Sequence, residues 1–211
     1  MEAKQIKIRT LAVSVLAVLL VELAARMTFL GSSLFGLGLT RFIQVLLMVW
    51  IAGTTEGGTA CIGLDRSRWF RGIRRGLLWS AAFGALALCA FGLLSLAGTR
   101  VLPMVRTPLP HKVNTLILFF LVGGVLAPVA EEIFFRGLLY GFFRRWGAAV
   151  AVILSTALFA FAHPLQSLPF TQIVGGLLFA LAYEVEGNLL VPITIHVLGN
   201  LAIFALSALR I

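Results

Sequence analysis

The sequence has little charge for its length. Of its 211 residues, only 12% are Asp, Glu, Lys or Arg, whereas a globular domain has about 25%. Acidic residues are the scarcest, with eight Asp and Glu against 17 Lys and Arg. A nucleic-acid-binding domain would place its basic residues on one wet face, but long apolar runs separate the basic clusters here. The composition therefore argues against a soluble protein and against nucleic acid as a partner.

Cysteine is also scarce. Cys61 and Cys89 are the only two, and they are not spaced as CxxC. A disulfide framework or a thiolate metal site needs more cysteines than this. Both residues are therefore predicted to be packing residues.

Apolar residues, by contrast, make up 60% of the chain, and the mean hydropathy is +1.04. They form seven stretches of membrane-spanning length. The prediction is an all-α polytopic transmembrane bundle of about seven to eight helices. The fourth stretch is too long for one straight span, and Pro128 inside it predicts a kink or a break. The second is interrupted at 54–58, which predicts a loop or a broken helix. The seven stretches are Leu11–Leu30, Phe42–Leu64, Leu77–Gly98, Val113–Phe143, Ala148–His163, Phe170–Tyr183 and Leu189–Leu209.

The distribution of Lys and Arg predicts the orientation of the bundle. With the N-terminus in the cytoplasm, most basic residues fall on the cytoplasmic side. Asp65–Arg75 also holds Trp69 and Phe70, which is typical of a segment that lies on the membrane surface and touches anionic headgroups. The cytoplasmic set is Lys4, Lys7, Arg9, Arg66, Arg68, Arg71, Arg74, Arg75, Arg136, Arg144 and Arg145; the opposite side holds Arg41, Arg100, Arg106, Lys112 and Arg210.

The first apolar stretch is predicted to be a retained helix, with a cleaved secretory signal as the alternative. Glu22 and Arg26 lie four residues apart in it, which predicts an ion pair. The polar segment Thr99–Lys112 is predicted to be an external loop. It divides the chain into N-terminal helices (1–112), which we expect to govern substrate access or specificity, and a catalytic core (113–211).

Ionisable residues at bilayer depth are costly and therefore mark candidate functional groups. They cluster in the second half of the chain. Glu132 and Arg136 share a helical face, so an ion pair accounts for them. Glu131 points about 100° away from Glu132 and gains no partner from its own helix.

Two histidines can reach the same depth as Glu131. From a turn near Arg145–Ala148, Glu131 lies about 21 Å back along one helix and His163 about 22 Å along the next, at 1.5 Å per residue. From a turn near Gly187, His196 and Asn200 lie about 14 and 20 Å into the last helix, on one face. The four side chains are therefore predicted to converge near mid-membrane.

Such a group can hydrolyse an acyl bond. A carboxylate and a histidine in a poorly hydrated pocket can act as a general-base pair for water. A second imidazole and a carboxamide can donate hydrogen bonds to the oxyanion of a tetrahedral intermediate. Nucleophilic catalysis is less favoured, because neither cysteine lies in this region and no serine has an evident base partner.

Three motifs in this region resemble the CPBP family, the CAAX protease and bacteriocin-processing endopeptidases that act inside membranes. The family carries EExxxR, FxxxH and HxxxN on successive membrane helices. This sequence has them in that order, over roughly Thr115 to Phe204. They are Glu131-Glu132 with Arg136, Phe159 with His163, and His196 with Asn200.

The resemblance implies that Glu131 and His163 activate the water and that His196 and Asn200 stabilise the oxyanion. It also implies that Glu132 and Arg136 support the site. The family is viewed as glutamic, and the HExxH helix typical of zinc peptidases is absent, so no cofactor is expected. A zinc ion on the two histidines and a glutamate is the alternative.

The expected function is cleavage of a peptide bond near the C-terminus of a membrane-anchored or lipidated protein or peptide. The expected location is the plasma (inner) membrane of a prokaryote, with the N-terminus in the cytoplasm. Two other functions stay open, namely a non-catalytic immunity or scaffold protein and an ion or proton relay for transport.

Overall fold

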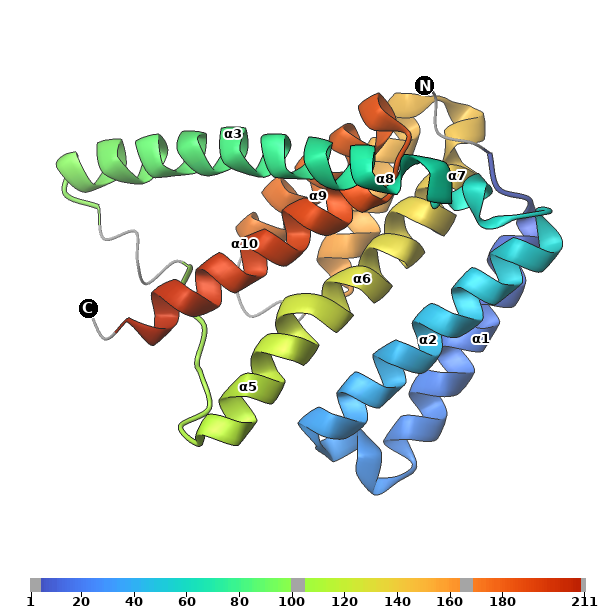
Figure 1. The fold of residues 1–211 in the computed structure, drawn as a ribbon, viewed down its shortest axis with the longest axis horizontal. Helices are drawn as coiled ribbons and strands as arrows, with labels where there is room; N and C mark the ends of the chain where they lie inside the picture. The colour runs from blue at the N-terminus through green and yellow to red at the C-terminus, as the bar shows by residue number, and fades with distance from the viewer. Residues whose placement is uncertain (1–4, 100–104, 164–168, 210–211) are drawn as a thin grey trace.

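The computed structural model describes residues 5–99, 105–163 and 169–209. In this part of the chain every regular element is helical, as the sequence predicts (Figure 1). The predicted all-α bundle is confirmed, and five helices are long and apolar enough to cross a membrane. These spans are Ile8–Arg26, Leu34–Thr55, Arg66–Leu96, Val113–Trp146 and Leu190–Ala208.

Helices α1 to α3 make up the first half of the described chain. Helices α1 and α2 pack side by side and are joined through the 3-10 turn η1. The 3-10 turns η2 and η3 then lead into α3. The bounds are Ile8–Arg26 (α1), Phe29–Ser32 (η1), Leu34–Thr55 (α2), Thr59–Ile62 (η2), Arg66–Arg68 (η3) and Trp69–Leu96 (α3).

Two of these helices begin earlier than the apolar pattern predicts. The side chain of Ser33 accepts a hydrogen bond from the Gly36 backbone N–H, so α2 begins at Leu34. Asp65 caps η3 in the same way, and α3 follows directly from Trp69. The arginines expected on a separate surface segment therefore occupy η3 and the first turns of a 28-residue helix. At the end of α2, Gly57 and Gly58 have positive φ, so the interruption there is a loop.

The second half begins with one long helical stretch that changes its hydrogen-bonding pattern along its length. Residues 122–126 and 133–140 are π-helical, and they flank the α-helical turns that contain Pro128. The stretch does not break at Pro128, because the widened turns on either side accommodate the missing N–H. Its parts are Val113–Leu121 (α5), Val122–Leu126 (η4), Ala127–Glu132 (α6), Ile133–Tyr140 (η5), Gly141–Phe143 (α7) and Arg144–Trp146 (η6).

Three more helices complete the bundle: Ala148–Phe161 (α8), Phe170–Glu186 (α9) and Leu190–Ala208 (α10). The predicted turns before α8 and α10 are confirmed, since Gly147 and Gly187 have φ of 103° and 55°. Helix α3 lies across α10, and their backbones approach closely. A Cβ on Gly72 or Gly76 would stand 2.5 Å from the side chain of Asn188 or Thr194.

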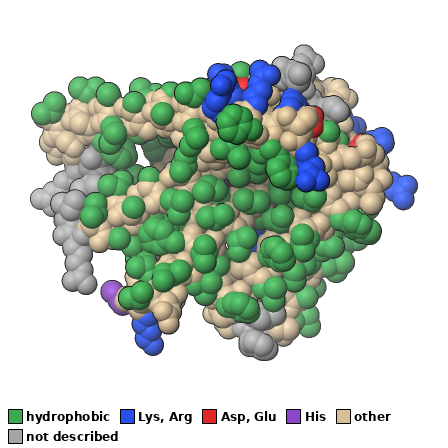
Figure 2. Space-filling model, in the orientation of Figure 1, with side chains coloured by type: hydrophobic (Ala, Val, Ile, Leu, Met, Phe, Trp, Pro, Cys, Tyr) green, Lys and Arg blue, Asp and Glu red, His purple; other side chains and the backbone are tan. Residues whose placement is uncertain are grey.

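The centre of the bundle is η5, of which seven of eight residues are buried. Apolar side chains cover the outside of the bundle, as expected for a surface in contact with lipid (Figure 2). Cys61 is buried, as predicted. Cys89 is exposed on α3, so its prediction as a packing residue is wrong.

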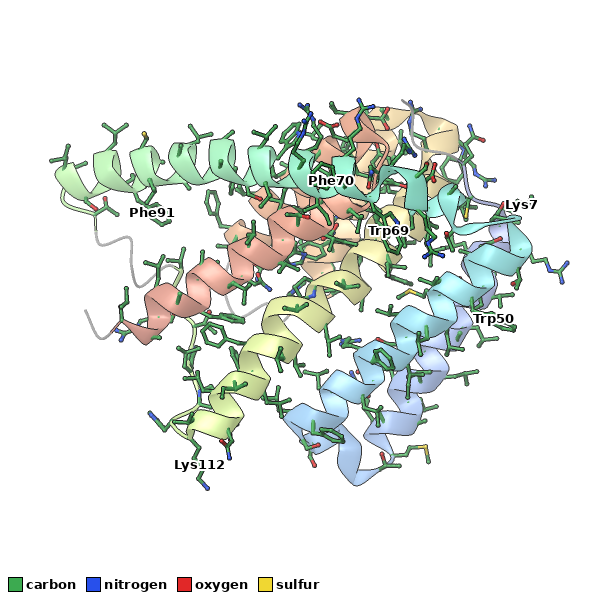
Figure 3. The ribbon with its side chains drawn as sticks, viewed as in Figure 1. Lys7, Trp50, Trp69, Phe70, Phe91 and Lys112 are labelled. Atoms are coloured by element: carbon green, nitrogen blue, oxygen red, sulfur yellow. The ribbon has the colours of Figure 1, made fainter. Side chains whose placement is uncertain are left out.

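Charged side chains gather at one end of the helices, which we call the basic end. Backbone hydrogen bonds from Ile6 to Gly141 and from Leu189 to Gly63 join its segments. Figure 3 shows Lys7 at this end and Lys112 at the opposite one. The predicted Glu22–Arg26 ion pair is present at 3.5 Å, and Arg41 also contacts Glu22. Of the basic residues predicted on this side, Arg136 is instead buried in the bundle, and Lys4 lies outside the described residues. The basic end comprises Lys7, Arg9, Arg66, Arg68, Arg71, Arg74, Arg75, Arg144 and Arg145.

Candidate active site

Glu132 joins two helices at the centre of the candidate site. Its Oε1 atom accepts hydrogen bonds from Arg136 Nη1 at 3.0 Å and from His196 Nδ1 at 2.8 Å. Glu132 ends α6, Arg136 follows one turn later in η5, and His196 lies on the facing side of α10. The predicted Glu132–Arg136 ion pair is therefore present, and it also holds the histidine.

This ion pair is fully buried, since the side chains of Glu132 and Arg136 are both 0% exposed. Arg136 Nη2 also donates to the Gly176 carbonyl of α9 at 3.2 Å. In the described part of the chain, Glu132 Oε2 and Arg136 Nε have no hydrogen-bond partner. A buried pair with unsatisfied atoms adds little net stability, but removal of one member leaves an uncompensated charge that costs about 3–5 kcal/mol.

Aromatic rings enclose the arginine and the histidine. The Arg136 guanidinium lies 4.5 Å from the Phe159 ring centroid and 5.2 Å from that of Phe179. Phe179 also stacks on the His196 ring, with centroids 4.5 Å apart and planes 21° apart. The rings exclude water from the Glu132 pair and fix the plane of the imidazole.

The contacts of His196 fix which of its nitrogens carries a proton. A guanidinium is always charged, so its carboxylate partner Glu132 only accepts hydrogen bonds. His196 Nδ1 must therefore carry the hydrogen that it donates to Glu132. The other ring nitrogen, Nε2, points toward the candidate catalytic carboxylate, 3.8 Å from Glu131 Oε2.

Glu131 differs from Glu132 in exposure and in partners. Its side chain is 24% exposed, and its contact with His196 is too long for a hydrogen bond. This agrees with the 100° offset between adjacent helical residues, which turns Glu131 away from Arg136. The carboxylate is therefore free to accept a proton from a bound molecule.

His163 lies just beyond the last residue of α8. Its Nδ1 atom is 2.8 Å from the Phe159 carbonyl oxygen, and its ring meets the Phe159 ring edge-on, with centroids 4.8 Å apart. Because a carbonyl only accepts, Nδ1 carries the hydrogen and Nε2 of the neutral ring is an acceptor. No hydrogen bond or ion pair joins His163 to Glu131 within the described residues, so their predicted meeting stays a prediction.

Asn200 lies one turn beyond His196 on α10. Its Nδ2 atom donates to the Gly123 carbonyl at 3.0 Å. Gly123 belongs to the π-helical segment η4, where the wider turns change the normal backbone pairing. Asn200 thus lies against the long central helix, two turns before Glu131.

Three contacts of the site are absent from the sequence motifs, namely Phe179, the Gly176 carbonyl and the Gly123 carbonyl. Phe179 lies three residues after Gly176 on α9, so the two share a helical face. A Cβ on Gly176 would come within 2.9 Å of Thr156 and 3.4 Å of Phe159. In the sequence, a glycine three residues before an aromatic residue was the one pattern that could have indicated that α9 contributes to the site.

The titratable side chains do not form an evident metal site. In the described ranges, no group of three or more His, Cys, Asp and Glu side chains is arranged to hold a metal ion. The Nδ1 atom of His196 and the Oε1 atom of Glu132 are committed to each other.

Comparison with known proteins supports the three-motif resemblance. Residues 113–202 match the family model described as Type II CAAX prenyl endopeptidase Rce1-like. This confirms the predicted relation to the CAAX proteases over the part of the chain that carries the motifs. Neither a curated protein nor a solved structure matches the chain.

Proposed function

On the premise that residues 113–202 match the Rce1-like CAAX endopeptidases, we propose that this integral membrane protein is an intramembrane peptidase. It hydrolyses a peptide bond near the C-terminus of a membrane-anchored or lipidated protein or peptide. The observation that carries the proposal is the contrast between the two adjacent glutamates. Glu132 is fully buried and one of its oxygens accepts hydrogen bonds from Arg136 and His196, whereas Glu131 is partly exposed and lies 3.8 Å from His196 Nε2 without a hydrogen bond.

The proposed reaction begins with a water molecule between Glu131 and His163. Glu131 takes a proton from the water, and His163 Nε2 accepts the second hydrogen bond of that water and orients it. The water oxygen attacks the carbonyl carbon of the scissile bond, and a tetrahedral oxyanion forms. When the intermediate collapses, the C–N bond breaks and Glu131 returns its proton to the leaving amine.

His196 and Asn200 stabilise the oxyanion in this proposal. His196 uses Nε2–H, which requires the ring to carry a proton on both nitrogens because Nδ1–H is already donated to Glu132. Asn200 uses the Nδ2 hydrogen that does not bond to Gly123. Each such donor contributes about 3–4 kcal/mol to transition-state stabilisation in known hydrolases.

The remaining assignments complete the proposal. The protein lies in the plasma membrane of a prokaryote with its basic end in the cytoplasm, and residues 1–112 govern access of the substrate. The reaction needs no metal. Incubation with a strong zinc chelator should therefore leave the rate unchanged, and activity that is lost on chelation and restored by zinc would contradict this assignment.

The decisive experiment compares the C-termini of membrane proteins by mass spectrometry in cells that carry the wild-type chain or Glu131→Gln. We expect a set of C-termini that are processed by the wild type and left intact by the variant. The matched control is Glu22→Gln, which alters another intramembrane glutamate in the ion pair with Arg26 and Arg41. The proposal fails if the folded Glu131→Gln protein processes the same C-termini as the wild type.

A further inference from the structure

A second polar site lies at the basic end, apart from the catalytic groups. It is a small pocket of about 70 Å³ between the first turns of α3 and the turn that joins α9 to α10. Turn η3 contributes Arg68, helix α3 contributes Arg71, Gly72 and Arg75, and the α9–α10 region contributes Val185, Glu186, Asn188 and Val191. The reaction proposed above uses none of these residues.

The walls of this pocket are held in place by their own contacts. Arg68 donates to the Gly187 carbonyl at 3.2 Å, and Asn188 Nδ2 donates back to the Arg68 carbonyl at 2.9 Å. Arg75 pairs with Glu186 at 2.6 Å. Gly72 allows the close approach, because a Cβ there would collide with the Asn188 side chain. The pocket is therefore a preformed feature of the α3–α10 contact.

The charge of the pocket is unbalanced. Asp65 and Glu186 are the acidic groups bonded to its arginines. Arg71 is exposed and makes no hydrogen bond or ion pair with another described residue, although it lines the pocket. Arg66 and Arg74 add positive charge on the same turns. An anion that enters this pocket would meet a guanidinium with all of its donors available.

The position of the pocket indicates where such an anion comes from. Trp69 and Phe70 lie on the same turn and are 46% and 82% exposed (Figure 3). Exposed aromatic rings beside arginines are typical of the membrane interface, where lipid phosphates lie. Beyond this turn, α3 continues as an apolar helix with exposed Leu78, Leu86 and Leu88. Figure 2 shows basic side chains gathered at this edge above an apolar face.

From these observations we infer that the pocket binds the phosphate of an anionic phospholipid headgroup through Arg68 and Arg71. Trp69 and Phe70, on other faces of the same turn, anchor this turn among the headgroups of the surrounding lipids. The inference rests on the membrane location of the chain and stands whether or not the chain is a peptidase. Free phosphate is also an anion, but it lacks the acyl chains that would lie against the exposed apolar residues of α3.

The test uses the full chain in detergent and counts bound lipids by native mass spectrometry. Phosphatidylglycerol and phosphatidylcholine are added in separate titrations. We expect the wild type to bind one phosphatidylglycerol molecule, and to bind it more tightly than phosphatidylcholine. Arg71→Gln should weaken the binding of phosphatidylglycerol about fivefold or more. Arg71→Lys should retain part of it, since the charge stays but the planar fork is lost.

Arg9→Gln is the matched control, because it removes one exposed positive charge from the basic end outside the pocket. Equal losses in Arg9→Gln and Arg71→Gln would overturn the inference in favour of a diffuse charge effect. No loss of phosphatidylglycerol binding in Arg71→Gln would overturn it as well.

Inorganic phosphate that binds as tightly as phosphatidylglycerol, or an acidic peptide that does so, would assign the pocket to another ligand. Arg71 makes no hydrogen bond or ion pair with another described residue, so Arg71→Gln should fold normally, and an unchanged melting temperature checks this.

Discussion

Adjacent glutamates with opposite surroundings are the main feature of the molecule at the scale of single residues. Glu132 neutralises a buried arginine, orients a histidine and has no exposed surface. Glu131 has a partly exposed carboxylate and one long contact. The same side chain is thus structural at one position and available for chemistry at the next, and substitution should separate the two roles.

Glu132→Gln should destabilise the protein far more than Glu131→Gln. The amide removes the negative charge that compensates Arg136, and the buried guanidinium then costs about 3–5 kcal/mol. Glu131→Gln removes only the partly exposed 3.8 Å contact with His196 and should change the melting temperature little. Thermal denaturation of both variants in the same detergent measures the difference. Equal melting temperatures for the two variants would show that the buried charge of Arg136 does not need Glu132 to compensate it.

Phe179→Leu should slow catalysis without weakening substrate binding. Phe179 stacks on His196 and does not belong to the proposed catalytic groups, so it acts as a positioning residue. Loss of an aromatic pair costs about 0.5–1.5 kcal/mol, which corresponds to a fall in kcat of about 2- to 10-fold at unchanged KM. Phe170→Leu is the control, because Phe170 lies exposed at the start of the same helix. A rise in KM at constant kcat would assign Phe179 to substrate binding.

At the scale of elements, close contact between α3 and α10 connects the two halves of the chain. Gly76→Ala would place a Cβ 2.5 Å from the Cβ of Thr194, and neither is the end of a flexible side chain. Overpacking of this kind costs about 1–3 kcal/mol. Gly84→Ala, two turns later on α3, meets nothing within 4 Å and should be neutral or slightly stabilising. The two melting temperatures test the contact, and equal values would contradict it.

The helices could be predicted from the sequence better than their starting residues could. Apolar runs identify each span, because a membrane helix needs about 20 apolar residues. They missed the first eight residues of α2 and of α3, since Gly36 and Gly38 interrupt one run and the arginines after Trp69 interrupt the other. In both cases a capping side chain, Ser33 or Asp65, decides where the helical region begins. The π-helical turns around Pro128 leave no sequence pattern of their own.

The candidate site was predictable only where its contacts are local. The Glu132–Arg136 pair follows from a spacing of four residues on one helix. The bond between Glu132 and His196 joins residues 64 positions apart, so it depends on how α10 rotates against α6. Residue counts from the turns put Glu131 and His196 at similar depth, but they do not show which of the two adjacent glutamates the histidine contacts. Packing of Phe179 against His196 is likewise a tertiary contact without a motif.

The whole molecule has one end rich in positive charge and a long apolar body. The ion pairs and caps of the basic end also stabilise its turns. There, burial opposes ionisation of Glu56, but hydrogen bonds from Thr10 and Lys7 outweigh it and lower the pKa of Glu56. The pKa of Asp65 is lowered by its hydrogen bonds with Ser67. Both carboxylates therefore stay charged within a mainly positive surface, and the net excess of arginine remains available to orient the protein in the membrane.

This charge asymmetry predicts that the basic end faces the cytoplasm, because positively charged turns are retained on that side during insertion. The prediction can be tested with single-cysteine variants of a chain in which Cys61 and Cys89 are replaced by alanine. Arg9→Cys and Arg74→Cys should react with a membrane-impermeant maleimide only after permeabilisation of the cells. Lys112→Cys, at the other end, should react in intact cells.

The Arg74 position makes the topology test sensitive to the fold as well as to the orientation. Side-chain hydrogen bonds hold the start of α3 beside the α9–α10 turn, and a backbone hydrogen bond joins Ile6, before α1, to Gly141. If Arg9→Cys and Arg74→Cys label from opposite sides, the packing of α3 against α10 is wrong. If both label from outside and Lys112→Cys does not, the fold stands and the orientation is inverted. In that case the lipid pocket would face the outer leaflet, and its binding to anionic lipid would have to be compared between leaflets.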